Sequence, residues 1–296
     1  MSEPRSSIPQ RVRRRLATAL PGPGRNPAAD EEIAALRQRL RRNKARLAKS
    51  KQNTERLRTL LHDTRGSLRD PFPGVPQSSS VSGVIEGVRR EGLTYLSPAN
   101  LRALASVMAE TELAGREGLV IEAGTALGGS AIVIAAAKSA GRPMKVYDVF
   151  GMIPEPTDAD GADVHKRYEQ IRGGAAAGVK GETYYGYRQD LFTEVTGSFA
   201  RHGVPVAEND VELVKGLFSD TIHLDEPVAF AHLDGDWYES TMTCLERIAP
   251  LLVTGGRVVL DDYYAWSGCR DAVNDYFRGR PGYHLELRAK VHVVRL

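Results

Sequence analysis

Four acidic side chains follow two apolar runs of the sequence, and their types point to cation chemistry. The string HLDGD ends in Asp234 and Asp236, and the string VVLDD ends in Asp261 and Asp262. If both runs are parallel strands of one sheet, their carboxyl ends meet at the same edge, so the four carboxylates lie close together. Like charges at short range repel each other unless a cation lies among them. The pattern therefore predicts a site for a hard divalent cation such as Mg²⁺. Asp236 has an alternative role, because it also stands where it could cap the helix expected from residue 238.

A second motif, VIEAGTALGGS (residues 120–130), leads an apolar run into a helix through three glycines. Glycines let the backbone approach a ligand closely, and the free amides at a helix start favour a carboxylate or phosphate. The dinucleotide fingerprint GxGxxG is not met, because Ala126 stands at its second glycine. The next apolar run ends at Asp148, which could accept hydrogen bonds from both hydroxyls of a ribose. These features favour S-adenosylmethionine as the cofactor and leave a dinucleotide as the alternative.

The elements that must position these motifs alternate between short apolar runs and amphipathic stretches. The runs 118–124, 144–150, 211–216, 228–234 and 257–262 have the length and composition of buried strands, with helices between them. This alternation predicts an α/β, Rossmann-like fold with a mostly parallel sheet that is covered by helices on both faces. The runs 283–288 and 291–296 predict a closing antiparallel hairpin, which is the arrangement of class I methyltransferases. Ser97 and Pro98 are predicted to begin a helix that ends at Gly115.

The charge of the chain is divided unevenly. Residues 1–70 carry 18 Lys and Arg against 7 Asp and Glu, a net charge of +11, and the other residues carry 22 against 30, a net charge of −8. We predict a mobile basic tail over 1–27, a basic helical arm over 28–69, a linker over 70–83 and a methyltransferase domain over 84–296. Apolar and polar residues of the arm recur at alternating steps of three and four, which is typical of a coiled coil. The arm is expected to pair copies of the chain or to act as a spacer. Nucleic acid is not an expected partner, because no aromatic residues interleave with the basic ones.

Composition excludes several classes of protein. The chain has 42% hydrophobic and 26% charged residues, as globular domains do. Its two cysteines, Cys244 and Cys269, cannot build a disulfide framework or a zinc cluster. The sequence has no apolar run of membrane-spanning length and no apolar segment behind the basic residues near its start. We therefore expect a cytoplasmic protein.

Five strings occur in an order and spacing that resemble the macrocin-type sugar O-methyltransferases of macrolide and aminocoumarin antibiotics. They are VIEAGTALGGS, YDVFGMIPEP, VKGLFSDTI, HLDGDWYES and LDDYYAWSGCRDAVNDYF, and the resemblance covers residues 93–277. It implies a Mg²⁺-dependent transfer of a methyl group from S-adenosylmethionine to a sugar hydroxyl, usually in a homo-oligomer. By position, it places the metal ligands at Asp234, Asp261 and Asp262. It places the cofactor contacts at Glu122, Gly124, Gly128, Ser130, Asp148, Gly216 and Phe218.

The sequence leaves the general base open. Catechol-type relatives of this metal site carry a lysine base three positions after the first metal aspartate, and here that position is Trp237. The candidates are Asp234 as a metal-bound carboxylate, Glu182 and His165. The last two belong to the long, glycine-rich stretch 151–188, hereafter the lid segment, which is predicted to cover the acceptor. Aromatic residues could stack against sugar rings, or they could pack the lid segment against the body. They are Tyr184, Tyr185 and Tyr187 of the lid segment, and Trp266.

Two other functions remain open beside methylation of a sugar-containing small molecule or saccharide. An O-methyltransferase of phenolic diols would use the same metal site. A non-catalytic homologue could use the arm to recruit partners, but then the acids Asp148, Asp234, Asp261 and Asp262 would have no structural reason to occur together.

Overall fold

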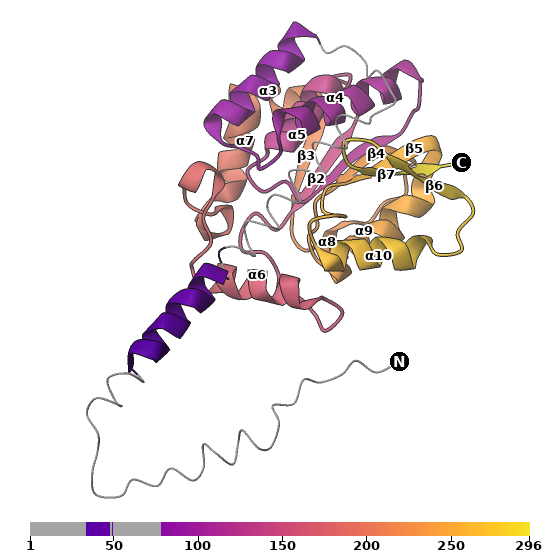
Figure 1. The fold of residues 1–296 in the computed structure, drawn as a ribbon. Helices are drawn as coiled ribbons and strands as arrows, with labels where there is room; N and C mark the ends of the chain where they lie inside the picture. The colour runs from indigo at the N-terminus through magenta and orange to yellow at the C-terminus, as the bar shows by residue number, and fades with distance from the viewer. Residues whose placement is uncertain (1–33, 48, 50–77) are drawn as a thin grey trace, which may run out of the picture. The chain divides into compact units, whose positions relative to one another are not determined.

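The computed structural model describes residues 34–47, 49 and 78–296. Residues 119–295 build one seven-stranded sheet with the strand order β3-β2-β1-β4-β5-β7-β6. The first five strands are parallel, and β7 and β6 close the sheet in antiparallel fashion. The predicted α/β fold with its final hairpin is confirmed (Figure 1). The strands are β1 (Leu119–Ala123), β2 (Met144–Asp148), β3 (Val211–Lys215), β4 (Val228–Leu233), β5 (Leu252–Leu260), β6 (Tyr283–Leu287) and β7 (Val291–Arg295).

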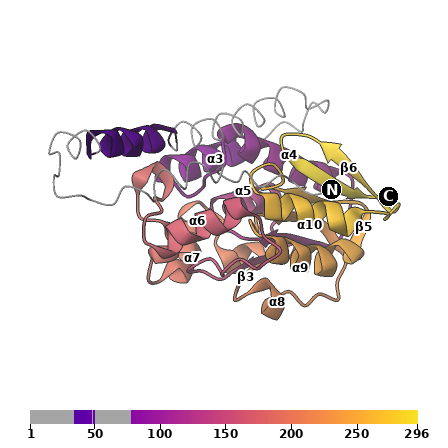
Figure 2. The same cartoon turned by 60° about the horizontal axis from the view of Figure 1, so that its bottom comes forward.

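Helices cover both faces of the sheet, because successive strand residues point to opposite sides. In β1, Val120 packs into one apolar cluster and Ile121 into the other. The first cluster lies under α3 (Ser79–Glu91), α4 (Pro98–Leu113), α5 (Gly129–Ala137) and α7 (Leu191–Arg201). The second lies under α9 (Tyr238–Ile248) and α10 (Ser267–Phe277), which run side by side (Figure 2). The short α8 (Phe218–Thr221) contacts α9.

Local signals explain where several elements begin and end. Ser97 accepts a hydrogen bond from the amide of Asn100, and Pro98 opens α4, as predicted. Helix α3 begins after Ser78, which accepts from the amide of Val81, so residues 79–83 of the predicted linker are helical. The helix expected from residue 238 ends at Ile248 and is followed by a 3₁₀ turn (Ala249–Leu251). Gly255 and Gly256 lie inside β5.

The lid segment has elements of its own. It contains α6 (Ala162–Arg172) and two 3₁₀ turns, Val179–Gly181 and Tyr185–Tyr187. A small apolar cluster of Ile171, Ala176 and Tyr184 holds it together. The segment is therefore a packed substructure rather than a plain connection.

Of the basic arm, the structure describes residues 34–47 and 49, and these are helical. The leucines of this helix, Leu36, Leu40 and Leu47, are 55–58% exposed. The predicted tail over 1–27 and the remainder of the arm lie outside the described residues. None of the helices formed by residues 34–47, 49 and 78–296 is long and apolar enough to cross a lipid bilayer.

Candidate active site

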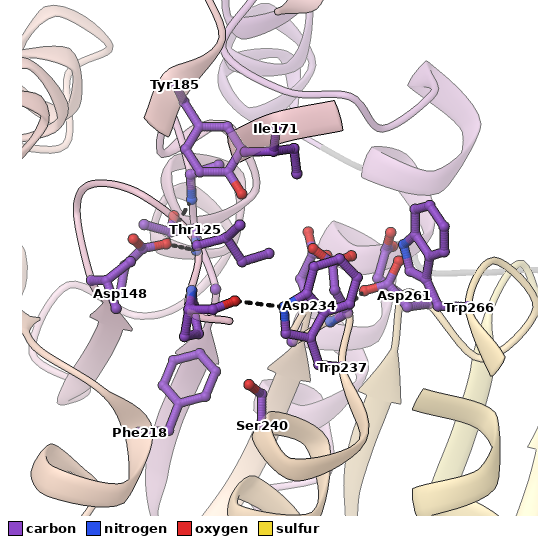
Figure 3. A pocket seen from close by; sticks show the side chains of 18 of the residues that line it. Thr125, Asp148, Ile171, Tyr185, Phe218, Asp234, Trp237, Ser240, Asp261 and Trp266 are labelled. Atoms are coloured by element: carbon purple, nitrogen blue, oxygen red, sulfur yellow. Dashed lines mark hydrogen bonds between the residues drawn. The ribbon is translucent and has the colours of Figure 1, made fainter. Parts of the chain in front are cut away.

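A pocket of about 490 Å³ lies at the carboxyl ends of β1, β2, β4 and β5, beneath the lid segment. Parallel α/β sheets bind ligands at this edge. Figure 3 shows Asp148 and Thr125 on one side of the pocket, and Asp234, Asp261 and Trp266 on the other. We call the first side the glycine-loop half and the second the acidic half.

In the glycine-loop half, Asp148 organises the turn between β1 and α5. Its carboxylate accepts hydrogen bonds from the amides of Thr125 (2.8 Å), Ala126 (2.9 Å) and Phe150 (2.6 Å). Burial raises the pKa of Asp148, and these three amide hydrogen bonds limit the rise. Asp148 lines the pocket, as expected for a cofactor contact, and it also fixes the shape of the loop.

The glycines of this loop serve packing within the protein, which differs from the predicted role of making room for a ligand. Gly124 has a positive φ of 88°, and a Cβ there would lie 1.9 Å from the carbonyl oxygen of Asp234. A Cβ at Gly128 would meet Val195 at 2.9 Å, and one at Gly129 would meet the carbonyl oxygen of Leu93 at 2.4 Å. Gly124 thus brings the β1 loop against the end of β4.

The other predicted cofactor residues divide into two groups. Gly124, Ser130 and Phe218 line the pocket together with Asp148. Three do not line it: Glu122, Gly128 and Gly216. At Gly216, a Cβ would lie 2.6 Å from the side chain of Thr221, so this glycine also serves packing.

Glu122 is fully buried behind the pocket and takes part in a chain of polar groups. It accepts a hydrogen bond from the hydroxyl of Ser130, and its Oε1 lies 3.5 Å from Nδ1 of His232. Nε2 of His232 lies 3.6 Å from Oδ1 of Asp261. Burial alone would lower the pKa of His232, but Asp261 and Glu122 raise it to about 9. This chain connects the two halves beneath the pocket floor.

In the acidic half, one carboxylate oxygen each from Asp234, Asp236 and Asp262 lies within 4.8 Å of the others. Burial, and after it the charge of Asp262, raises the pKa of Asp234 and of Asp236 well above the ordinary range. Burial followed by the charge of Asp261 raises the pKa of Asp262. Within the described residues, no lysine or arginine forms an ion pair with these three carboxylates. The cluster therefore fits a bound cation.

Asp261 has protein partners of its own. Its Oδ1 lies 3.2 Å from Nζ of Lys290, in addition to its contact with His232. Burial would raise the pKa of Asp261, but these two cations lower it to about 2. Asp261 lines the pocket beside the cluster as a stable carboxylate.

Asp236 does not cap α9, which corrects the alternative considered for it. The helix begins at Tyr238, and the residue before it, Trp237, offers no side-chain cap. The amide of Tyr238 instead donates to Asp160 of the lid segment, at 2.8 Å. Asp236 has a positive φ of 55°. A non-glycine residue in this region costs conformational energy, and such strain gathers at functional sites.

The lid segment supplies one wall of the pocket. Tyr184 and Tyr185 line it with ring centroids 4.3 Å apart, whereas Tyr187 does not line it and donates its hydroxyl proton to the carbonyl of Ile171. Trp237 and Trp266 meet edge to face on the opposite wall, at 5.9 Å. Aromatic residues of the lid segment therefore both pack and face the pocket.

Two predicted base candidates lie away from the pocket. Glu182 is exposed and absent from the lining residues. His165 is exposed on α6, and its Nε2 lies 3.1 Å from the carbonyl oxygen of Thr157. Asp234 is the predicted candidate that lines the pocket.

Sequence reasoning missed several residues of the site. Arg167 of α6 lines the pocket, and its guanidinium lies 5.7 Å from the centroid of the Tyr184 ring. Thr125 lines it with a buried hydroxyl that has no hydrogen-bond partner within the described residues. A free buried hydroxyl beside Asp148 fits a polar ligand in the glycine-loop half. Arg167 belongs to no motif that could have marked it, because α6 joins the pocket only through tertiary packing. Thr125 lies within the motif VIEAGTALGGS, where the glycines and not the threonine drew the prediction.

Comparison with known proteins assigns this architecture to a family. Residues 86–284 match the family model described as Macrocin-O-methyltransferase (TylF). The chain is 37% identical over 181 residues to 8-demethyl-8-(2,3-dimethoxy-alpha-L-rhamnosyl)-tetracenomycin-C 4'-O-methyltransferase from Streptomyces olivaceus, which covers 58% of this chain and 63% of the relative. It is 30% identical over 215 residues to mycinamicin III 3''-O-methyltransferase from Micromonospora griseorubida, which covers 67% of this chain and 78% of the relative. The chain thus spans less than two thirds of the length of the first of these relatives.

Solved structures share the fold. The O-methyltransferase NovP matches 81% of this chain and 98% of its own, with a TM-score of 0.55 and 22% identity. A calicheamicin methyltransferase matches 81% of this chain and 91% of its own, with a TM-score of 0.54 and 18% identity.

Proposed function

The chain belongs to the macrocin O-methyltransferase family, and from this membership and the geometry of the pocket we propose that it methylates a hydroxyl group of a sugar. The observation that supports this most directly is the pocket itself, which joins a glycine-loop half to an acidic half at one edge of the sheet. The relatives from Streptomyces and Micromonospora are named for O-methylation of glycosylated natural products. We propose an acceptor of the same class, a sugar carried by a small molecule.

We propose that the glycine-loop half holds S-adenosylmethionine, which supplies an electrophilic methyl group when bound. Asp148 lines the pocket and can accept hydrogen bonds from the cofactor. The buried hydroxyl of Thr125 has no partner within the described residues and can also bind the cofactor. Phe218 and the exposed Leu217 offer an apolar surface for a flat ring. Glu122, Gly128 and Gly216 do not line the pocket, and they act indirectly through its shape.

We propose that Asp234, Asp261 and Asp262 hold Mg²⁺, which would bind neighbouring acceptor hydroxyls and lower their pKa. Asp234 and Asp262 belong to the carboxylate cluster. Asp261 lies next to it, and Lys290 and His232 keep it ionised. Three carboxylates from two adjacent strand ends give the set of hard oxygen donors that this cation prefers.

We propose Asp236 as the general base. Its carboxylate lies in the same cluster, so it can accept a proton from a hydroxyl that is held there. Asp236 thus takes the place of Glu182 and His165, which lie outside the pocket.

The function is tested by incubating the protein with labelled S-adenosylmethionine, Mg²⁺ and two sets of acceptors. One set contains rhamnosylated aromatic compounds, and the other contains catechol and caffeic acid. We expect methyl transfer to the sugar hydroxyls only, and its loss in excess EDTA with recovery on adding Mg²⁺ or Mn²⁺. Transfer only to the phenols would support the phenolic alternative, and full activity in EDTA would contradict the metal-dependent mechanism.

We propose that the catalytic unit begins at α3 rather than at residue 84. Val81 and Ile85 of α3 are buried in the core beneath it. A variant that starts at Ser78 should keep the stability of the full chain, whereas one that starts at Val84 should melt at a lower temperature because it lacks Val81. Equal melting temperatures for both variants would contradict this boundary.

We propose further that copies of the chain associate through the arm as a homo-oligomer. Leu36, Leu40 and Leu47 recur on one side of the helix and are exposed. Residues 34–47 contain six Lys and Arg and no Asp or Glu, so paired copies repel each other there. The mass measured by light scattering should therefore increase between about 50 and about 500 mM salt. A monomeric mass at both salt concentrations would contradict the proposal.

A further inference from the structure

The lid segment is attached to the body at several places, including a hydrogen bond from Lys180 to the carbonyl of Arg90. Three of its attachments lie on the wall of the acidic half. The carbonyl of Pro154 accepts a hydrogen bond from the indole of Trp237, at 2.9 Å. Asp160 accepts from the amide of Tyr238, at 2.8 Å. The carboxylate of Asp163 accepts from both the amide and the hydroxyl of Ser267.

Two of these contacts close the open ends of helices. Helices α9 and α10 begin after Trp237 and Trp266, and neither tryptophan offers a side-chain cap. The first amides of a helix lack partners within it and favour a negative charge. Asp160 supplies that charge to α9, and Asp163 supplies it to α10, although both belong to a segment far away in the sequence.

The fit around both carboxylates is close. A Cβ at Gly268 of α10 would lie 2.3 Å from Oδ1 of Asp160, and one at Gly161 would lie 2.3 Å from Oγ of Ser267. Asp160 is 8% exposed and also accepts from the amide of Thr157, at 3.0 Å. Burial would raise the pKa of Asp163, but the hydrogen bonds from Ser267 outweigh it and lower the pKa. The hydrogen bonds to α10 therefore favour the ionised form of Asp163.

The two tryptophans that precede the capped helices lie directly beside the acids of the pocket. Trp237 follows Asp236 in the chain, and Trp266 and Asp262 both line the acidic half. The two tryptophans contact each other edge to face, so a shift of either helix start would move both rings. These three attachments of the lid segment thus lie on the wall that an acceptor would face, whereas Asp148 and Thr125 lie on the other side of the pocket (Figure 3).

We propose that Asp160 and Asp163 are positioning residues of the acceptor site: they cap α9 and α10 from the lid segment and thereby hold Trp237 and Trp266 in place. This inference rests on the proposed function, because it assigns the acidic half to the acceptor. The lid segment then does more than cover the pocket, since its attachment shapes the acceptor wall.

The first test needs no acceptor, because Trp237 and Trp266 are the two tryptophans of the chain. Asp163→Ala is the main variant, because Asp163 is exposed and its loss leaves the core intact. Asp160→Ala is the second variant, and Asp158→Asn is the matched control, since Asp158 is an exposed carboxylate of the same segment. We expect acrylamide to quench the tryptophan fluorescence of Asp163→Ala more strongly, and trypsin to cleave its lid segment faster. Quenching and cleavage equal to those of Asp158→Asn would overturn the proposal.

The second test separates positioning from a general loss of stability. With a rhamnosylated aromatic compound as the acceptor probe, Asp163→Ala should raise the acceptor KM about tenfold, as expected from losing hydrogen bonds to a charged group. The affinity for S-adenosylhomocysteine should stay within about twofold of the wild-type value, and Asp163→Asn should recover part of the loss, because an amide oxygen can still accept from Ser267. An unchanged acceptor KM in a variant with exposed tryptophans would overturn the positioning role. A wild-type protein that methylates none of the sugar probes would contradict the proposed function, and the fluorescence and proteolysis would still decide whether the two carboxylates hold the wall.

Discussion

The two halves of the pocket are held together by different kinds of contact. The glycine-loop half is shaped by backbone amides that donate to one carboxylate, Asp148, from a loop that follows the adjacent strand. The acidic half collects side chains from the ends of β4 and β5 and is closed by the lid segment. The first half is therefore shaped by main-chain hydrogen bonds between two adjacent strand ends, whereas the second also depends on the lid segment.

The largest expected effect is at Asp236, in the acidic half. Asp236→Asn removes the proposed base while it keeps the size of the side chain, so kcat should fall by about 10²–10⁴-fold. Affinity for S-adenosylhomocysteine should change little, because the glycine-loop half is built separately. If Asp236 served only as a helix cap, the alternative that its place in the sequence allows, we would predict a smaller effect. Steady-state kinetics with the sugar probe, with calorimetry for the cofactor product, decides between the two predictions.

Gly124→Ala is expected to disrupt the close contact between the two halves. The added Cβ would lie 1.9 Å from the carbonyl oxygen of Asp234, so the β1 loop and the end of β4 must move apart. The positive φ of 88° adds strain for any residue with a Cβ. We expect a destabilisation of about 3 kcal/mol, at the upper end of common point mutations. Chemical denaturation measures it, with Gly141→Ala as the control, because a Cβ at Gly141 meets no atom within 4 Å.

Asp148→Asn tests whether the glycine-loop half binds its ligand independently of the acidic half. An amide at this position has one acceptor oxygen instead of two, so it cannot receive all three backbone amides. We expect affinity for S-adenosylhomocysteine to fall by about tenfold or more, given the worth of hydrogen bonds to a charged group. Mn²⁺ binding, measured by its electron paramagnetic resonance signal, should remain. Simultaneous loss of Mn²⁺ binding would show that the halves are coupled.

The sequence predicted the fold well, because the strands and helices depend on local patterns. Strand runs, the Ser97 cap and the final hairpin follow from periodicity and capping rules, and Asp148 follows from its place at the end of β2. The acidic half was predicted only in part. Asp160, the lid carboxylate that caps α9 in place of Asp236, lies 78 residues before Tyr238 in the chain, and no local pattern encodes this contact.

The smallest expected effect is at the two former base candidates of the lid segment. It tests whether either side chain takes part in catalysis. Glu182 and His165 lie on the exposed side of the lid segment, away from the lining residues. A base must come within hydrogen-bond distance of the proton that it removes, and neither side chain lines the space where an acceptor would lie. Glu182→Gln and His165→Gln should therefore keep kcat within about twofold of wild type, as surface substitutions usually do. Measured over a range of pH, their rate profiles should superimpose on that of the wild type. A loss of the acidic limb of the profile in either variant would show that the lid segment moves by far more than its attachments to the body allow, and would return the base to that segment.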